Sequence, residues 1–246
     1  IARVGDHLYM YCDGVLLSST SGWLNFAIPE NTNPLQVGKY GDSVSYFNGY
    51  LDSLRITTGV ARYARAYTPQ IRHIAQPSTR DPFWSDVILS MSGDNLTENK
   101  GKVPTITGVT VDTSVKRYGS GSLKKNNVSD KISFVSVPEF NLKKDAFTIE
   151  LWYNPGNSVG TGRYLAAQSG AAGSRGWTIM VGPSGTGAIQ FGFSLDGSNT
   201  YSVGNAASVT VSTNTWYHIA VVRDRNSNNF TLYVNGNRVA SQNVGD

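Results

Sequence analysis

The segment 216–236 (WYHIAVVRDRNSNNFTLYVNG) constrains the fold more than any other part of the chain. Apolar and β-branched residues form two runs in it, one on each side of a polar, asparagine-rich stretch. The second run ends in Asn235-Gly236, a dipeptide favoured in two-residue hairpin turns because both positions need a positive φ. This pattern predicts a meander of three antiparallel strands, at residues 216–223, 230–234 and 238–243.

Part of this meander occurs a second time at the start of the chain. Residues 1–3 (IAR) match residues 221–223 (VVR), and residues 8–14 (LYMYCDG) match residues 230–236 (FTLYVNG). Solenoid repeats have periods of about 20–50 residues, so two copies this far apart indicate whole domains in tandem. We therefore expect the chain to open in the middle of one repeat and to close in the middle of the next. Both copies fit the same strand position, and the sequence alone does not choose between them.

The composition is typical of many strands joined by tight turns, with 26 glycines and 11% aromatic residues among 246. The net charge of +4 is scattered and concentrates only in the pairs Lys124-Lys125 and Lys143-Lys144, so we expect no nucleic-acid partner. No run of about 18 apolar residues occurs, so we expect no membrane insertion. Cys12 is the single cysteine; it excludes an intrachain disulfide and is expected to be a buried hydrophobic residue.

The remaining strands are expected to be short and closely spaced, which is typical of a β-sandwich, and no helix of useful length is expected. The stretch 77–82 (PSTRDP) predicts a linker, because two prolines bracket small polar residues. The predicted strands outside the meander and its copy are 35–38, 46–56, 83–91, 105–111, 122–124, 131–135, 147–153, 164–168, 177–181, 188–195, 200–203 and 208–211.

Four phrases of the sequence together resemble the laminin-G-like group of concanavalin A-type jelly rolls. The resemblance implies an all-β fold, a concanavalin A-like (laminin-G-like) jelly-roll sandwich of two antiparallel sheets. A fifth phrase, DPFWSDV at 81–87, resembles the entry of such domains in bacteriophage structural and tail proteins. The four phrases are FTIELW at 147–152, WYHIAVVR at 216–223, LYVNG at 232–236, and FNGYLDSLRIT at 47–57 followed by GVARY at 59–63.

The order of these phrases is rotated relative to that family. In the family, the strand that holds Asp52 and Arg55 follows the meander, whereas here it precedes it. We predict that residues 1–76 are the closing portion of one repeat and residues 83–246 the opening portion of the next. Together they would complete one sandwich in permuted order. The closing portion is donated by the same chain or by a neighbouring chain. In the second case the protein would self-associate by strand exchange.

The sequence contains no pattern that indicates catalysis. Glycoside hydrolases of this sandwich carry paired carboxylates on one strand, spaced E-x-D-x-x-E, and no such run occurs here. Glu150 is expected to hold a structural hydrogen bond, and His218 to be a satisfied strand histidine. The resemblance also implies a structural Ca²⁺, with Asp52 and Asp94 as candidate ligands. The alternative is that Asp52 pairs with Arg55 or caps a backbone turn.

Long polar loops with aromatic residues favour sugar binding, because sugar rings stack on aromatic faces while amides and hydroxyls meet sugar hydroxyls. We therefore expect a non-enzymatic, lectin-like module that binds a surface glycan or receptor, on a phage virion appendage, hence at a virion surface or extracellular. The alternatives are a structural or decorating virion protein that mediates subunit contacts without binding sugar, and an inactive relative of glycoside hydrolases. Core packing is the alternative role for either tryptophan among the candidate ligand-binding residues, which are Trp23, Arg163, Tyr164, Arg175, Trp177 and Tyr201.

Overall fold

The computed structural model describes part of the chain. For residues 2–4, 7–12, 15–20, 201–203, 229 and 243 it describes the backbone alone. The described residues are 2–4, 7–12, 15–20, 31–39, 47–59, 62, 83–142, 145–159, 162–182, 187–198, 201–203, 209–223 and 229–243.

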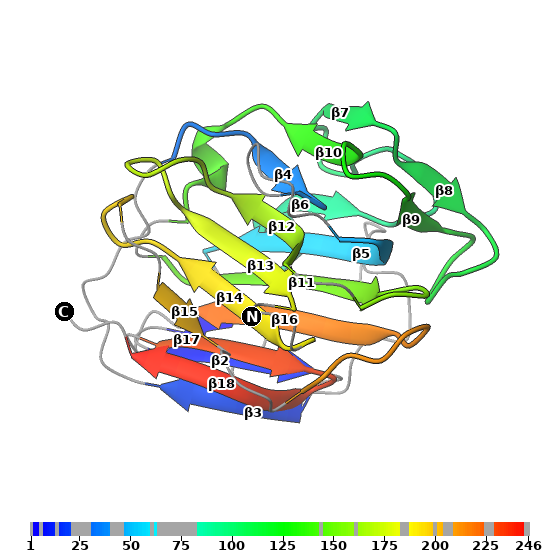
Figure 1. Cartoon of the computed structure of the whole chain (residues 1–246). Helices are drawn as coiled ribbons and strands as arrows, with labels where there is room; N and C mark the ends of the chain where they lie inside the picture. The colour runs from blue at the N-terminus through cyan, green and yellow to red at the C-terminus, as the bar shows by residue number, and fades with distance from the viewer. Residues whose placement is uncertain are drawn as a thin grey trace.

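Two large antiparallel sheets dominate this part of the chain (Figure 1). Apart from two short 3-10 turns, η1 (Trp84–Asp86) and η2 (Pro138–Phe140), the described elements are all strands, which confirms the predicted all-β sandwich. No helix in these residues is long and apolar enough to cross a membrane. The first sheet has the order β15 (Tyr201–Val203), β14 (Ile189–Phe193), β13 (Trp177–Val181), β12 (Arg163–Gln168), β4 (Leu35–Val37), β10 (Lys131–Phe134) and β7 (Pro104–Thr107).

The second sheet contains the meander at one end. Its member β6 lies beside β5, off the main strand order. The order is β18 (Asn237–Asn243), β17 (Asn229–Val234), β16 (Tyr217–Arg223), β11 (Phe147–Asn154), β5 (Gly49–Thr58), β9 (Ser122–Lys125) and β8 (Thr110–Asp112), with β6 at Val87–Met91.

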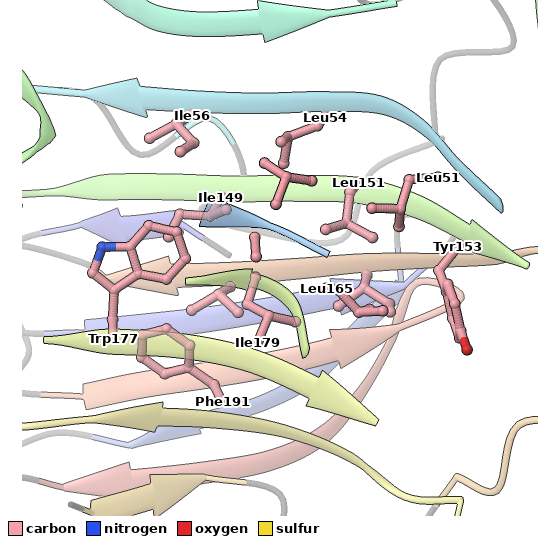
Figure 2. Packing of buried hydrophobic residues seen from close by; sticks show 14 of the residues in the cluster. Leu51, Leu54, Ile56, Ile149, Leu151, Tyr153, Leu165, Trp177, Ile179 and Phe191 are labelled. Carbon is pink, nitrogen blue, oxygen red and sulfur yellow. The ribbon is translucent and has the colours of Figure 1, made fainter. Parts of the chain in front are cut away.

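The core lies between the two sheets and follows the alternation of each strand (Figure 2). On β11, the side chains of Ile149 and Leu151 point inward, and on β13 those of Trp177 and Ile179 do the same. All four side chains are at most 1% exposed. Because burial of one such side chain stabilises the fold by roughly 1.5–3 kcal/mol, the two facing strands alone contribute a large share of the cohesion between the sheets.

Strands β4 and β5 lie inside the two sheets formed by the later part of the chain. β5 pairs with β11 on one side and with β9 and β6 on the other, and β4 pairs with β12 and β10. Opposite Leu151 the β5 strand has a bulge, where Ser53 adopts a φ of 53°. This is the pairing that completion of the sandwich requires. The division into portions of two successive repeats, and donation by a neighbouring chain, stay predictions.

Three predicted strands differ from those observed. Of the predicted strand 208–211, the described residues 209–211 form only an isolated bridge, between Thr210 and Ala188. Residues 83–91 begin with the turn η1, and only Val87–Met91 forms a strand. Residues 105–111 form parts of two strands in different sheets, β7 and β8. The chain turns between them, where the Val109 amide donates a hydrogen bond to the Thr107 carbonyl at 2.9 Å. Each of these last two segments contains a break that the prediction overlooked: Ser85-Asp86 lies in η1, and Gly108, with a φ of 65°, lies where the chain changes sheet.

The meander forms as predicted, and its second turn has the expected geometry. Asn235 and Gly236 adopt φ values of 50° and 77°, as a type I′ turn requires. The first copy forms a separate sheet of β1 (Ala2–Val4), β2 (His7–Cys12) and β3 (Val15–Thr20). This sheet lies against β16, β17 and β18 (Figure 1). The second copy therefore holds the shared position in the sandwich, and the first copy is stacked against it.

Candidate functional site

A hollow lies on the outer face of the sheet formed by β12, β13 and β14. We call it the sheet-face hollow. It encloses about 500 Å³, open solvent included. On β13 its lining residues Thr178 and Met180 alternate with core residues, and on β14 Gln190 and Gly192 do the same. The described lining residues are Tyr164, Ser169, Arg175, Gly176, Thr178, Met180, Gln190, Gly192 and Phe193.

Two of the predicted ligand-binding residues meet in this hollow, and a third does not. Tyr164 and Arg175 both line it, and Arg175 Nη1 donates a hydrogen bond to the Ser198 carbonyl at 2.6 Å. Arg163 is not among the lining residues; it donates hydrogen bonds to the Val159 carbonyl (2.8 Å) and to Ser158 Oγ (3.2 Å). The hollow therefore presents an aromatic ring and a guanidinium group beside amide and hydroxyl side chains.

The predicted role of Trp177 in ligand binding needs correction. Trp177 is 1% exposed and belongs to the hydrophobic core between the sheets (Figure 2). A ring without exposed surface cannot stack on a sugar, so Trp177 has the alternative role, core packing. Trp23 lies outside the described residues, and of Tyr201 only the backbone position on β15 is described. Their predicted roles stay predictions.

Asp52 and Asp94 both bind the loop that precedes β9. Asp52 Oδ2 accepts hydrogen bonds from the amides of Arg117 (3.3 Å) and Tyr118 (3.2 Å), while its Oδ1 accepts one from the Ser53 hydroxyl (2.9 Å). Asp94 Oδ1 accepts hydrogen bonds from the backbone amide and hydroxyl of Ser120 and from the Gly121 amide, the last at 3.1 Å.

This donor set fits turn capping better than Ca²⁺ coordination. A cation binds carboxylate oxygens and would compete with the N–H and O–H groups that already donate to them. Within the described ranges, no group of three or more His, Cys, Asp or Glu side chains is placed to hold a metal. The capping alternative stated for Asp52 is thus the one that the geometry supports, whereas Arg55 pairs with a different carboxylate. Calcium binding stays a prediction.

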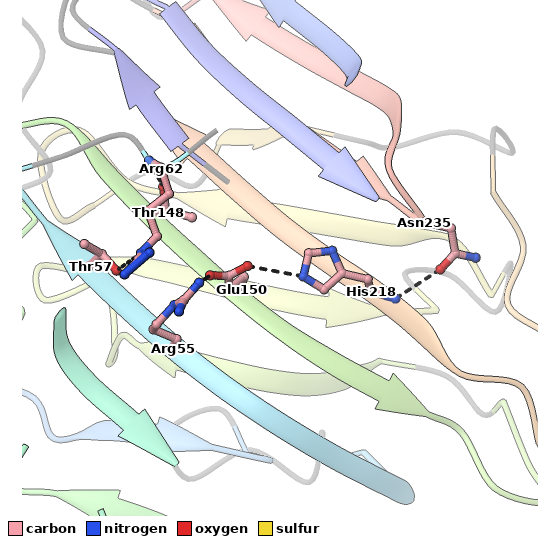
Figure 3. A network of polar contacts seen from close by, with 7 residues as sticks. All are labelled: Arg55, Thr57, Arg62, Thr148, Glu150, His218 and Asn235. Atoms are coloured by element: carbon pink, nitrogen blue, oxygen red, sulfur yellow. Dashed lines mark hydrogen bonds and ion pairs between the residues drawn. The ribbon is translucent and has the colours of Figure 1, made fainter. Parts of the chain in front are cut away.

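Glu150 lies between Arg55 and His218 on the outer side of the second sheet (Figure 3). Arg55 Nε lies 2.8 Å from Glu150 Oε1, and His218 Nε2 lies 3.3 Å from Oε2. All three residues are at most 3% exposed. Burial alone would raise the pKa of Glu150, but the charge of Arg55 and the hydrogen bond from His218 together hold that pKa below its ordinary value.

The predicted structural roles of Glu150 and His218 are therefore confirmed. The His218 amide also donates a hydrogen bond to Asn235 Oδ1 at 3.0 Å, which ties this strand to the turn of the meander (Figure 3). The network is shielded from solvent, because β1 and β2 pack against β16 on the side that carries His218 (Figure 3). A buried carboxylate with both oxygens engaged has no access to a substrate, and its charge serves to fix the register of three strands.

Sequence reasoning missed most of the sheet-face hollow. Thr178, Met180 and Gln190 are outward positions of strands that were predicted correctly, so the alternation contained a signal for them. That signal was insufficient because an outward position on a sheet can be open to solvent or covered by another layer. Only the arrangement of the layers shows that this face is open.

The comparisons with known proteins agree with this architecture. A family model described as "Concanavalin A-like lectin/glucanases superfamily" matches residues 129–246. The matched stretch extends from just before β10 through β18 and so includes the sheet-face hollow and the strands that carry Glu150 and His218. No curated protein and no solved structure matches the chain significantly.

Proposed function

Residues 129–246 belong to the concanavalin A-like lectin/glucanases superfamily, and on this premise we propose that the protein is a non-enzymatic module that binds carbohydrate in the sheet-face hollow. The observation that carries the proposal is the composition of the hollow. Tyr164 offers a ring face for the apolar side of a sugar, and Arg175 and Gln190 offer hydrogen-bonding groups for its hydroxyls. Gly192 adds no side chain, which leaves room over β14.

The proposal includes the absence of hydrolysis. Retaining and inverting glycosidases need two carboxyl groups that flank the scissile bond. Among the described residues no Asp or Glu lines the sheet-face hollow, and Glu150 is buried in its contacts with Arg55 and His218. Incubation of the protein with laminarin and carrageenan is expected to release no reducing ends. Release of reducing ends would overturn the non-enzymatic part and support a glycoside hydrolase relative.

A glycan array tests the binding part, followed by calorimetry with the best neutral oligosaccharide. Tyr164→Ala and Gln190→Ala are each expected to weaken binding by about tenfold, which corresponds to ~1.4 kcal/mol. Thr105→Ala, at an exposed position on β7, serves as the control and is expected to leave the affinity unchanged. Absence of binding to every glycan, or equal effects of the three variants, would contradict the proposal.

The duplicated meander supports a second candidate role, that of a structural or decorating virion protein whose sandwich mediates subunit contacts. The first copy forms a sheet of its own outside the two large sheets, and such an element can be exchanged with a neighbouring chain. In both roles we propose a place at a virion surface or outside the cell. Size-exclusion chromatography with light scattering tests the second role, because exchange between two chains doubles the mass, whereas an unchanged monomer at high concentration would speak against it.

A further inference from the structure

A second hollow lies at one end of the sandwich, where β9, β5 and the turn after β11 come together. We call it the end hollow. The strands that form it are in direct register, since Gly49 pairs with Lys125 and Tyr50 pairs with Lys124. Its volume is about 500 Å³, open solvent included. The lining residues are Asn48, Gly49, Tyr50, Lys124, Lys125, Asn126, Gly156 and Asn157.

The backbone of Gly49 creates the floor of this hollow. A Cβ atom at Gly49 would lie 2.1 Å from the carbonyl oxygen of Asn154 and 2.8 Å from the carbonyl carbon of Pro155, so no other residue fits. The turn above it is held in place because Asn154 Oδ1 accepts a hydrogen bond from the Gly156 amide at 2.8 Å. The close approach of β5 to this turn is therefore built into the chain, and the space beside it stays open.

Side chains that donate hydrogen bonds dominate the lining. Asn48, Asn126 and Asn157 are exposed and carry amide groups, and Tyr50 adds a ring and a hydroxyl. In the part of the chain that the structure describes, no Asp or Glu is among the lining residues. The two nearby carboxylates are engaged, because Asp112 Oδ2 lies 3.0 Å from Lys124 Nζ and Asp130 Oδ2 accepts the amides of Asn126 and Asn127.

Positive charge accumulates at this end of the molecule. Lys125 is 2% exposed, and its Nζ donates hydrogen bonds to backbone carbonyls, including that of Asn127 at 2.7 Å. Burial lowers the pKa of Lys125 to about 8; Asp130 opposes this effect, while the charges of Lys39 and Arg163 add to it. Lys124, half-buried, is therefore the lysine whose charge an anion in the hollow can meet, while Lys125, repelled by Lys39 and Arg163, adds positive potential from below the surface.

We propose that the end hollow binds the carboxylate or sulfate group of an acidic saccharide, an inference that rests on the proposed carbohydrate-binding role. Lys124 attracts the anionic group, and the amides of Asn126 and Asn157 donate hydrogen bonds to its oxygens or to neighbouring hydroxyls. Tyr50 lies beside Lys124, whose Nζ is 5.6 Å from the centre of the Tyr50 ring. A sugar ring can therefore stack on Tyr50 while the anionic group of that sugar meets Lys124.

The test measures binding of a heparin oligosaccharide, which carries both anionic groups, against dextran of the same length. Wild-type protein is expected to bind heparin and to bind dextran at least about tenfold more weakly, a difference of ~1.4 kcal/mol. Lys124→Gln is expected to lose most of that difference. The double variant Asp112→Asn/Lys124→Gln keeps the net charge and removes the carboxylate that Lys124 pairs with. It is expected to show the same loss.

Lys102→Gln is the matched control for general attraction of a polyanion to a cationic protein. This substitution removes the same charge as Lys124→Gln, but from a lysine that does not line the hollow. The Lys102 Nζ lies 5.6 Å from the centre of the Phe140 ring. The substitution is expected to change heparin affinity by less than about twofold. Equal losses in the Lys102 and Lys124 variants would overturn the proposal, as would displacement of heparin by inorganic sulfate at equal charge concentration, which indicates a bare anion site. Tyr164→Ala distinguishes the two sites: it should weaken neutral sugars and spare heparin, so either proposal can fail alone.

Discussion

The two copies of the meander share a sequence pattern and a hairpin turn, yet they occupy different places. The second copy, β16–β18, is part of a large sheet, and β16 pairs with β11 at seven positions, from Tyr217 to Arg223. In the first copy, the described register of β1 covers three residues and pairs only with β2. Both copies have the hairpin. They differ in the strand before it, because β16 joins the second copy to a large sheet and β1 does not.

This difference teaches that a duplicated hairpin is placed by its neighbours rather than by its own sequence. Edge strands with open hydrogen-bonding groups seek a partner, and β11 offers one edge for one strand. β16 pairs with that edge along its full length, so the first copy cannot pair with β11. The first copy instead packs face to face against the second. As a consequence Thr231 and Tyr233, on the outward side of β17, are both 0% exposed.

The largest expected effect comes from the charge network that joins β16 of the second copy to β11 and β5. Glu150→Gln leaves the buried Arg55 guanidinium without its counter-charge, and loss of one partner of a buried ion pair costs about 3–5 kcal/mol. We expect the free energy of unfolding in urea to fall by that amount. A loss below about 1 kcal/mol would show that the network does not anchor β16 to β11.

The same network predicts a dependence of stability on pH. The pKa of Glu150 is lower in the folded state than its ordinary value of 4.5, so the unfolded chain binds the proton more tightly. Stability from this group is present above about pH 5 and is lost as the pH falls below that value. Urea midpoints measured between pH 3 and 7 should show this fall in the wild type and a weaker fall in Glu150→Gln. Parallel curves for the two proteins would contradict the assignment.

A matched pair of proline substitutions compares the copies directly. Thr231 on β17 corresponds to Tyr9 on β2, and Thr231 pairs with Val222 on one side and Ser241 on the other. Thr231→Pro removes a ladder hydrogen bond in the middle of the sheet and is expected to cost at least ~3 kcal/mol. Tyr9→Pro is expected to cost less than ~1 kcal/mol, because, among the described strands, β2 pairs only within the three-stranded sheet and with no strand of the two large sheets. Equal losses in the free energy of unfolding in urea would mean that the two copies contribute equally to stability.

The sequence was sufficient for the part of the fold that local patterns determine. The alternation in β11 and β16 and the turn at Asn235-Gly236 were readable, because each depends on neighbouring residues only. The resemblance predicted that the strand with Asp52 and Arg55 belongs to the same sandwich as the meander, and β5 does pair with β11 of that sheet. Local patterns could not show which outward faces of the sheets are covered by another layer. Thr231 and Gln190 are both outward polar residues on strands, yet the first is fully buried and the second lines an open hollow.

The candidate sites were harder to predict for the same reason. Tyr164 and Arg175 were found because aromatic and cationic residues in polar loops stand out, whereas Trp177 was assigned wrongly because a tryptophan flanked by glycine reads equally well as exposed. Tyr50 and Lys124, which line the end hollow, come from strands more than seventy residues apart. No local signal brings such positions together; only the pairing of β5 with β9 does.

The turns of the two copies provide a smaller test. Asn235 has a φ of 50°, its side chain accepts the His218 amide, and its own amide donates to the His218 carbonyl at 2.9 Å. Asn235→Ala removes the side-chain bond and places alanine in the left-handed region, for an expected loss of about 1–2 kcal/mol. Asp13→Ala, the matched change in the first copy, is expected to lower stability by less than half of that. The reverse order in thermal unfolding would place the first copy in the sheet.

The smallest effect concerns the population in which the copies exchange places. By the sequence match Cys12 corresponds to Val234, and Val234 pairs with Ile219 on β16. The Ile219 side chain points into the core, whereas β2 lies on the opposite, His218 side of β16, so a cysteine at position 219 cannot reach Cys12 in the observed arrangement. We therefore expect Ile219→Cys alone to form no disulfide under mild oxidation.

Combined with Thr231→Pro, the same substitution should give a disulfide to Cys12, because a weakened β17 yields its place at the edge of β16 to β2. A non-reducing gel then separates a bridge within one chain from a covalent dimer, which tests self-association by strand exchange. Cys12→Ser in the same background is the control and must abolish the bridge. If no bridge forms in the Thr231→Pro background either, the two copies are not interchangeable. The order of preference at the β16 edge would then be set by the hairpins themselves and not by the strands that connect them.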